Sequence, residues 1–138
     1  MGESATHIGL LMRLVEYVRT SAENVQQLAL LHDLPGMIGC DKPPKLGSYR
    51  PDLYATDAPT TTVIVGEAKT ARDLETTHSK EQIRSFLRHL AMYPGSQLIL
   101  AVPWSSRARA QQLLAVLSKD SGVHNVKLVV IDDMQEIA

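Results

Sequence analysis

The sequence contains a single cysteine, Cys40, so no disulfide can form within the chain, and the clustered thiolates of a structural zinc site are missing. A chain without a disulfide framework suits a reducing compartment, and we expect a cytoplasmic protein. The five histidines show no HExxH spacing, which disfavours a zinc hydrolase. Neither a GxGxxG nor a GxxxxGK(S/T) motif occurs in the sequence, which disfavours a nucleotide-binding protein of either type.

Aromatic residues are also scarce, at 4% of 138 residues, whereas hydrophobic residues make up 44%. The apolar bulk therefore comes from Val, Ile, Leu and Ala, which suits helices packed on a sheet. With 21% charged residues, the composition is that of a folded protein rather than a disordered one. The length is that of one domain, so we expect a single domain over residues 1–138.

Neither sign of charge dominates, because Lys and Arg total 14, Asp and Glu total 15, and the net charge is −1. No overall positive field would attract nucleic acid, so any DNA contact must be local. No apolar run approaches the ~20 residues that span a bilayer, and no signal-peptide pattern opens the chain. We therefore expect no membrane partner.

The N-terminal part of the chain, from His7 to about His32, predicts an amphipathic helix. The Thr20 to Glu23 stretch has the form of a capping box, where the helical region would break and restart through Val25, Leu28 and Leu31. One helix and two helices both fit this pattern. Apolar residues recur at three- and four-residue spacing in its first part: Ile8, Leu11, Met12, Val15 and Val18.

Residues 34–48 are rich in proline and glycine and predict a loop. Two apolar runs follow, Tyr49 to Ala55 and Thr61 to Lys69, and the turn-like residues between them predict an antiparallel hairpin. The second run, TTVIVGEAK, is apolar at consecutive positions. This pattern indicates a strand that is covered on both faces and lies in the middle of a sheet.

The rest of the chain alternates between helical and strand patterns. Together with the N-terminal helix and the hairpin, these patterns predict an α/β fold with a mixed sheet and helices on both of its sides. The predicted elements are a helix from Ser79 to Tyr93, a strand from Gln97 to Val102, a helix from Ser106 to Lys119 and a strand from Val126 to Ile131.

Charged residues occur at the end of the predicted central strand, where Glu67 and Lys69 are two residues apart and project from the same face. Burying both costs desolvation, which a protein accepts when the charges are paired or serve a site. The hairpin would bring Asp52 beside Glu67. Two carboxylates together with the Ala68 carbonyl offer the hard oxygen ligands that Mg²⁺ or Mn²⁺ prefer.

Pro51-Asp52 and Glu67-Ala68-Lys69 resemble the two halves of the motif of the PD-(D/E)xK nucleases, which include many restriction enzymes, Holliday junction resolvases and related exonucleases. The resemblance extends over roughly Ile8 to Val102, because the common core of the family runs α-β-β-β-α-β. It implies a restriction-endonuclease-like fold, to which this chain would add a C-terminal α-β pair.

The resemblance also implies roles for individual residues. Asp52 and Glu67 would hold the metal, and Lys69 would orient or activate the attacking water and stabilise charge on the phosphate. Family members often add a glutamate from the first helix and a glutamine from the helix after the motif. Glu16 and Gln82 are in matching places, with Glu23 as an alternative to Glu16.

Two further patterns have a structural interpretation beside the functional one. Ser79-Lys80-Glu81-Gln82 is also a capping box, in which Gln82 would reach back to the amide of Ser79. Lys80, Arg84 and Arg88 recur every four residues and form a basic stripe, suited either to DNA phosphates or to solvent.

These observations favour an Mg²⁺- or Mn²⁺-dependent deoxyribonuclease, an endonuclease that hydrolyses phosphodiesters with Asp52, Glu67, Lys69 and Gln82. The alternative is a catalytically inactive fold relative that binds a nucleic acid or a protein partner. A domain of this size has little surface for sequence recognition. We therefore expect a homodimer or a partner protein that supplies recognition.

Overall fold

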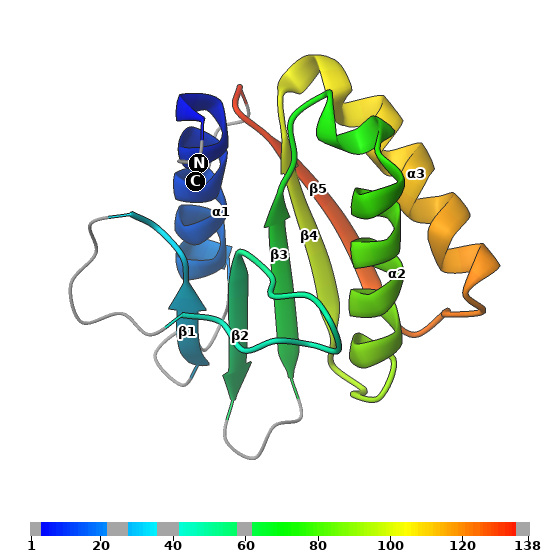
Figure 1. Ribbon diagram of the computed structural model, residues 1–138. Helices are drawn as coiled ribbons and strands as arrows, with labels where there is room; N and C mark the ends of the chain where they lie inside the picture. Colours follow the sequence, from blue (N-terminus) through cyan, green and yellow to red (C-terminus); the bar gives the residue numbers. More distant parts are fainter. Residues whose placement is uncertain (1–3, 22–27, 36–41, 58–61, 135–138) are drawn as a thin grey trace.

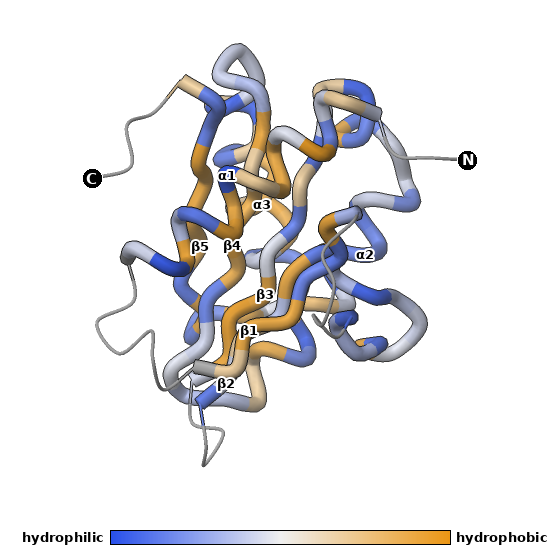
Figure 2. Tube along the Cα trace, turned by 90° about the vertical axis from the view of Figure 1, so that its left-hand side faces the viewer, coloured by the Kyte–Doolittle hydropathy of each residue, from blue (hydrophilic) through white to orange (hydrophobic). Residues whose placement is uncertain are grey.

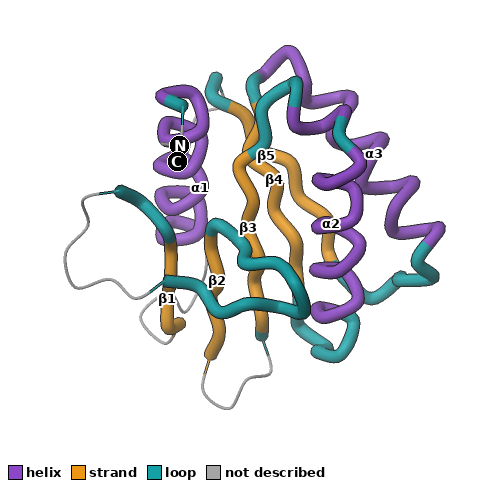
Figure 3. The backbone as a smooth tube through the Cα atoms, in the orientation of Figure 1, coloured by secondary structure: helices purple, strands orange, loops and turns teal. Residues whose placement is uncertain are grey.

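The computed structural model describes residues 4–21, 28–35, 42–57 and 62–134. Five strands form one mixed sheet in the order β1-β2-β3-β4-β5, which Figure 1 and Figure 3 show from the same side. The elements are, in chain order, α1 (Ala5–Ser21), β1 (Leu28–His32), β2 (Leu53–Asp57), β3 (Val63–Ala68), η2 (Asp73–Glu75), α2 (Thr77–Leu90), β4 (Gln97–Val102), η3 (Trp104–Ser106), α3 (Arg107–Asp120) and β5 (Lys127–Asp132).

The sheet combines an antiparallel half with a parallel half. β1, β2 and β3 pair antiparallel, and β3, β4 and β5 pair parallel. β3 lies at the centre and all six of its residues are buried, as its run of consecutive apolar residues predicted. The element order is the predicted α-β-β-β-α-β followed by α-β.

Helices cover both faces of this sheet, as predicted. In Figure 1, α1 lies on one side of the sheet, and α2 and α3 lie on the other. Two groups of buried apolar residues result, one between α1 and the sheet and one between the sheet and the α2–α3 pair. Apolar residues accordingly follow the strands in Figure 2. None of the described helices is long and apolar enough to cross a membrane.

The N-terminal region differs from the prediction. α1 is confirmed, but its buried stripe includes Leu10 and Leu14, whereas Met12 is 58% exposed and Ile8 is only partly buried. The predicted restart of the helix through Leu28 and Leu31 is wrong, because Leu28–His32 forms the edge strand β1. Its backbone pairs with β2, with Leu31 opposite Tyr54, and this long-range pairing outweighs the local helical pattern. Val25 and the predicted break at 22–23 lie outside the described residues.

α1 packs unusually close to β3 at one point. A Cβ atom built on Gly66 would lie 2.7 Å from Leu14 Cδ2 and 3.0 Å from two other carbons of the Leu14 side chain. Only glycine leaves room for this approach. Because Glu67 follows Gly66 directly, the contact holds α1 beside the end of β3.

Replacing Gly66 with alanine should destabilise the protein, because the new Cβ would overlap Leu14. Overpacking of this kind costs about 1–3 kcal/mol, which equilibrium urea unfolding would measure. Gly9→Ala is the matched control in α1, where no described atom lies within 4 Å of the new Cβ. There, alanine should stabilise the helix by about 0.5–1 kcal/mol. A Gly66→Ala protein as stable as the parent would contradict tight packing between α1 and β3.

Candidate active site

The β2–β3 pairing brings Asp52 and Glu67 together at one end of the sheet. Leu53 pairs with Gly66, so the residues just beyond, Asp52 and Glu67, face each other. The Asp52 backbone N–H donates to Glu67 Oε1 at 2.8 Å, and Asp52 Oδ2 accepts from the Ala68 N–H at 2.9 Å. The hairpin therefore places both halves of the motif in contact.

Lys69 completes a buried polar chain at the same point. Its Nζ lies 3.2 Å from Glu67 Oε2 and donates to Gln82 Oε1 at 2.5 Å. The Lys69 and Glu67 side chains are only 8% and 3% exposed. A buried ion pair requires additional hydrogen bonds to offset its desolvation, and Asp52 N and Gln82 supply them here.

Gln82 acts as the partner of Lys69 and does not cap α2. The predicted capping box is wrong, because the helix begins earlier, with Thr76 as its N-cap. The Thr76 backbone is extended, and its side chain accepts from the Ser79 N–H at 3.1 Å. Ser79 lies inside the first turn, so Gln82 lies one turn further along and is directed at Lys69.

The electrostatics of the site centre on Glu67. Burial, followed by the nearby Asp52 carboxylate, raises the pKa of Glu67 from its usual 4.5 to about 8, although Lys69 and the Asp52 backbone act in the opposite direction. Lys69 alone therefore does not offset the cost of a charged Glu67. An additional cation beside the two carboxylates would favour the ionised form.

These residues line a cavity of about 350 Å³ between the end of β3 and the start of α2. The cavity is also lined by His7 and Asp73, which the sequence analysis did not predict as site residues. His7 Nε2 lies 3.2 Å from Asp52 Oδ2. Asp73 Oδ2 accepts from the Thr70 N–H at 3.0 Å and shapes the loop after the motif. A signal for His7 was present, because its spacing to Leu11 and Leu14 places it on the buried stripe of α1.

The structure does not bring the proposed helix-one glutamate to the site. Glu16 is exposed on α1 and is not among the residues that line the cavity. It follows His7 by nine residues, or about 13 Å along a helix. The alternative, Glu23, lies outside the described residues.

The candidate metal donors are the Asp52 and Glu67 carboxylates and the Ala68 carbonyl. The Ala68 N–H points to Asp52, and the carbonyl of a strand residue points to the same side as its N–H. Within the described ranges, no group of three or more His, Cys, Asp or Glu residues is suited to hold a metal ion. Two carboxylates and a backbone oxygen would suit Mg²⁺ or Mn²⁺, which also retain water ligands.

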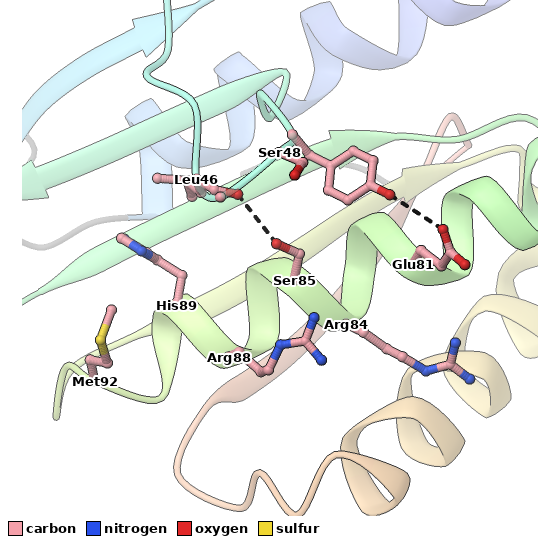
Figure 4. Close-up of a pocket in the computed structure, with 10 residues that line it drawn as sticks. Leu46, Ser48, Glu81, Arg84, Ser85, Arg88, His89 and Met92 are labelled. Carbon is pink, nitrogen blue, oxygen red and sulfur yellow. Dashed lines mark hydrogen bonds between the residues drawn. The ribbon is translucent and has the colours of Figure 1, made fainter.

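The predicted basic stripe is divided between two cavities. Arg84 and Arg88 line a groove of about 730 Å³ between α2 and residues 46–49, and Figure 4 shows both guanidinium groups projecting from the helix. Lys80 instead lines a different cavity, between α2 and α3. Tyr49 lines the groove, and His78 lines the candidate active site. Their rings pack edge-on, with the ring centres 5.5 Å apart. The groove thus adjoins the site.

Comparison with known proteins does not assign a family. No protein-family model matches the chain, and no curated protein matches it. Among solved structures, the fold is similar to a chain described as "CdiA-CT/CdiI toxin and immunity complex from Yersinia pseudotuberculosis", at 15% identity and a TM-score of 0.44. The match covers 71% of this chain and 91% of that chain. A likeness this distant carries no argument about activity.

In metal-free protein, raising the pH from 4.5 to about 8 should destabilise the parent relative to Glu67→Gln. In this window folded Glu67 retains its proton while unfolded Glu67 has lost it, so the free energy of unfolding falls as the pH rises. Glutamine does not titrate and removes this slope. Chemical unfolding at a series of pH values in EDTA would measure the difference. The exposed Glu16→Gln control should keep the slope of the parent, and parallel curves for parent and Glu67→Gln would contradict the raised pKa.

Proposed function

We propose that this protein is a metal-dependent DNA nuclease of the PD-(D/E)xK type. The observation that carries the proposal is the convergence of Asp52, Glu67, Lys69 and Gln82 in one cavity, with the Lys69 amine held between Glu67 and Gln82. A buried lysine beside two carboxylates is costly for stability alone. Its cost is understandable where the charges serve a reaction.

Asp52, Glu67 and the Ala68 carbonyl would hold Mg²⁺ or Mn²⁺ in this proposal. When bound, the ion supplies Lewis-acid stabilisation of charge on the phosphate. The raised pKa of Glu67 supports a cation here, because a positive charge would relieve the repulsion between its carboxylate and that of Asp52.

Lys69 would orient the attacking water and stabilise negative charge that develops on the phosphate. Gln82 acts through Lys69 as a positioning residue, since its Oε1 accepts from the amine. Glu67 also restrains the amine, from 3.2 Å. Two anchors hold the ammonium group in one place, and such preorganisation makes a fixed charge effective in catalysis.

The groove beside the site would hold the phosphate backbone of the substrate. Within the described part of the chain, Arg84 and Arg88 have no acidic partner, whereas Arg107 and Arg109 are ion-paired with Asp132 and Glu75. The net charge of −1 leaves attraction of DNA to local groups such as these two arginines. Recognition of a particular sequence would come from a second copy of the chain or from a partner protein.

The purified protein should cleave DNA when Mg²⁺ or Mn²⁺ is present, and Lys69→Met should lower the single-turnover rate by a factor on the order of 10² or more. Methionine retains most of the buried volume but removes the charge. DNA affinity, measured with Ca²⁺ in place of Mg²⁺, should change little. Linear, nicked, single-stranded and four-way-junction DNA would be compared as substrates.

Asp52→Asn/Glu67→Gln is the companion variant and should be inactive with every substrate. Melting curves would establish that each variant is folded. A folded Lys69→Met protein that cleaves at the parental rate would remove the proposed role of Lys69. A parent that binds DNA without cleaving any of the four forms would favour the inactive binding module.

Arg84→Ala with Arg88→Ala should weaken DNA binding and flatten its dependence on salt, because fewer counterions are released on association. The slope of log K against log salt should become less negative by about 1 for each phosphate that the variant no longer neutralises. The control is Lys119→Ala with Lys127→Ala, which removes the same charge from exposed positions at the end of α3 and the start of β5. Equal slopes in the two double variants would exclude the groove as a phosphate-binding site.

A further inference from the structure

The hydroxyl of Ser79 lies in the wall of the candidate active site. Ser79 lines the cavity that contains Lys69, yet the residue is only 3% exposed. Its backbone N–H donates to Thr76 Oγ1, but no described residue forms a hydrogen bond with its own Oγ. The Oγ atom is not sealed off from solvent, so a molecule in the cavity can reach it. A nearly buried hydroxyl that faces a cavity takes its partner there, either water or a ligand.

The start of α2 offers a second kind of donor at the same place. The first N–H groups of an α-helix have no partner within the helix. In α2, Thr76 Oγ1 accepts from the Ser79 N–H, and the Thr76 carbonyl accepts from the Lys80 N–H. In the part of the chain that the structure describes, the Thr77 and His78 N–H groups have no such partner. His78 also lines the cavity, so its N–H is the one available there.

Ser79 belongs to the face of α2 that meets Lys69. Residues three apart on a helix are neighbours on its surface, and Gln82 is three residues after Ser79. Gln82 Oε1 accepts from Lys69 Nζ at 2.5 Å. A ligand held by Ser79 would therefore lie near a buried ammonium group and at the positive end of the helix dipole. Both favour an anion.

We propose that the start of α2 is a phosphate-binding subsite, in which the Ser79 hydroxyl and the His78 N–H donate to one phosphodiester of the substrate strand. The inference rests on the proposed function, since it takes DNA as the ligand of the site. It goes further because it assigns two phosphate donors that are not part of the nuclease motif.

The charges around the subsite suit a phosphate that binds together with a cation. Arg50 lines the cavity and, among the described residues, has no acidic partner. Asp73 also lines it, but its Oδ2 already accepts a backbone N–H. Lys69 and Arg50 attract an anion, whereas the Asp52 and Glu67 carboxylates repel it until a divalent ion offsets their charge. Binding is therefore measured with Ca²⁺ present.

Ser79→Ala separates this role from a structural one. Alanine retains the buried Cβ atom and removes only the hydroxyl. DNA affinity should fall about tenfold, the scale of one lost hydrogen bond to a charged group. The midpoint of urea unfolding should equal the parental value or exceed it, because no hydrogen bond within the protein is lost. A less stable Ser79→Ala protein that binds DNA as the parent does would overturn the proposal.

Ser106→Ala is the matched control. Ser106 is also a buried serine at the start of a helix, 5% exposed, and its side chain forms no capping hydrogen bond. It does not line the candidate site. This variant should bind DNA as the parent does, and an equal loss of affinity in both variants would overturn a specific role for Ser79.

The NMR signal of the His78 amide tests the second donor. The ¹⁵N-labelled protein would be titrated with whichever of the four DNA forms binds most tightly. The His78 amide proton should move downfield as its N–H gains a charged acceptor, and by less in Ser79→Ala. A parallel titration with inorganic phosphate distinguishes a free anion from the substrate strand. A shift caused by inorganic phosphate but not by DNA would overturn the assignment to the substrate.

The outcomes separate the two proposals. DNA cleavage by the parent, combined with parental DNA affinity in Ser79→Ala or an unmoved His78 amide, would overturn the subsite and leave the nuclease proposal intact. A parent that binds DNA through Ser79 and His78 but cleaves none of the four forms would support the subsite and overturn the nuclease proposal. A parent that does not bind DNA would overturn both.

Discussion

One hydrogen bond joins the fold to the candidate site, from the Asp52 backbone N–H to Glu67 Oε1 at 2.8 Å. It depends on the register that pairs Leu53 with Gly66, because a slip of one residue would move the Asp52 backbone N–H away from its place opposite Glu67. The close contact of Gly66 with Leu14 then holds α1 against the same end of the sheet. Strand register and helix position are therefore determined together, and the cavity depends on both.

The acceptor of this hydrogen bond, Glu67, is also the group whose burial costs the site most. The bond satisfies one oxygen of a carboxylate that is almost fully buried and whose pKa is raised to about 8. Lys69 and Gln82 offset part of the desolvation cost without abolishing it. A site of this kind contributes little to stability, and its buried charges are best explained by a bound ligand that balances them. A divalent cation would do so on the carboxylate side and a phosphate on the lysine side.

Different elements of the fold supply different groups of the proposed site. Asp52 lies just before β2 and Glu67 in β3, α1 supplies His7, and α2 supplies both Gln82 and the arginines of the adjoining groove. The Tyr49–His78 contact lies where the groove meets the site. A substrate strand bound along α2 would thus reach the carboxylates without any overall positive charge on the protein.

Local patterns determined much of this molecule from the sequence alone. The β-branched run of β3, the hairpin, the two C-terminal helices and the Glu67–Lys69 spacing all depend on neighbours within a few residues, and the structure has each of them. Tertiary structure decided the rest. Leu28–His32 became a strand through pairing with β2, against a locally helical pattern. Whether a helix-one side chain reaches Asp52 depends on how α1 lies across the sheet, so His7 and not Glu16 is beside it. Spacing along a chain determines which residues share a face, and only packing determines what that face meets.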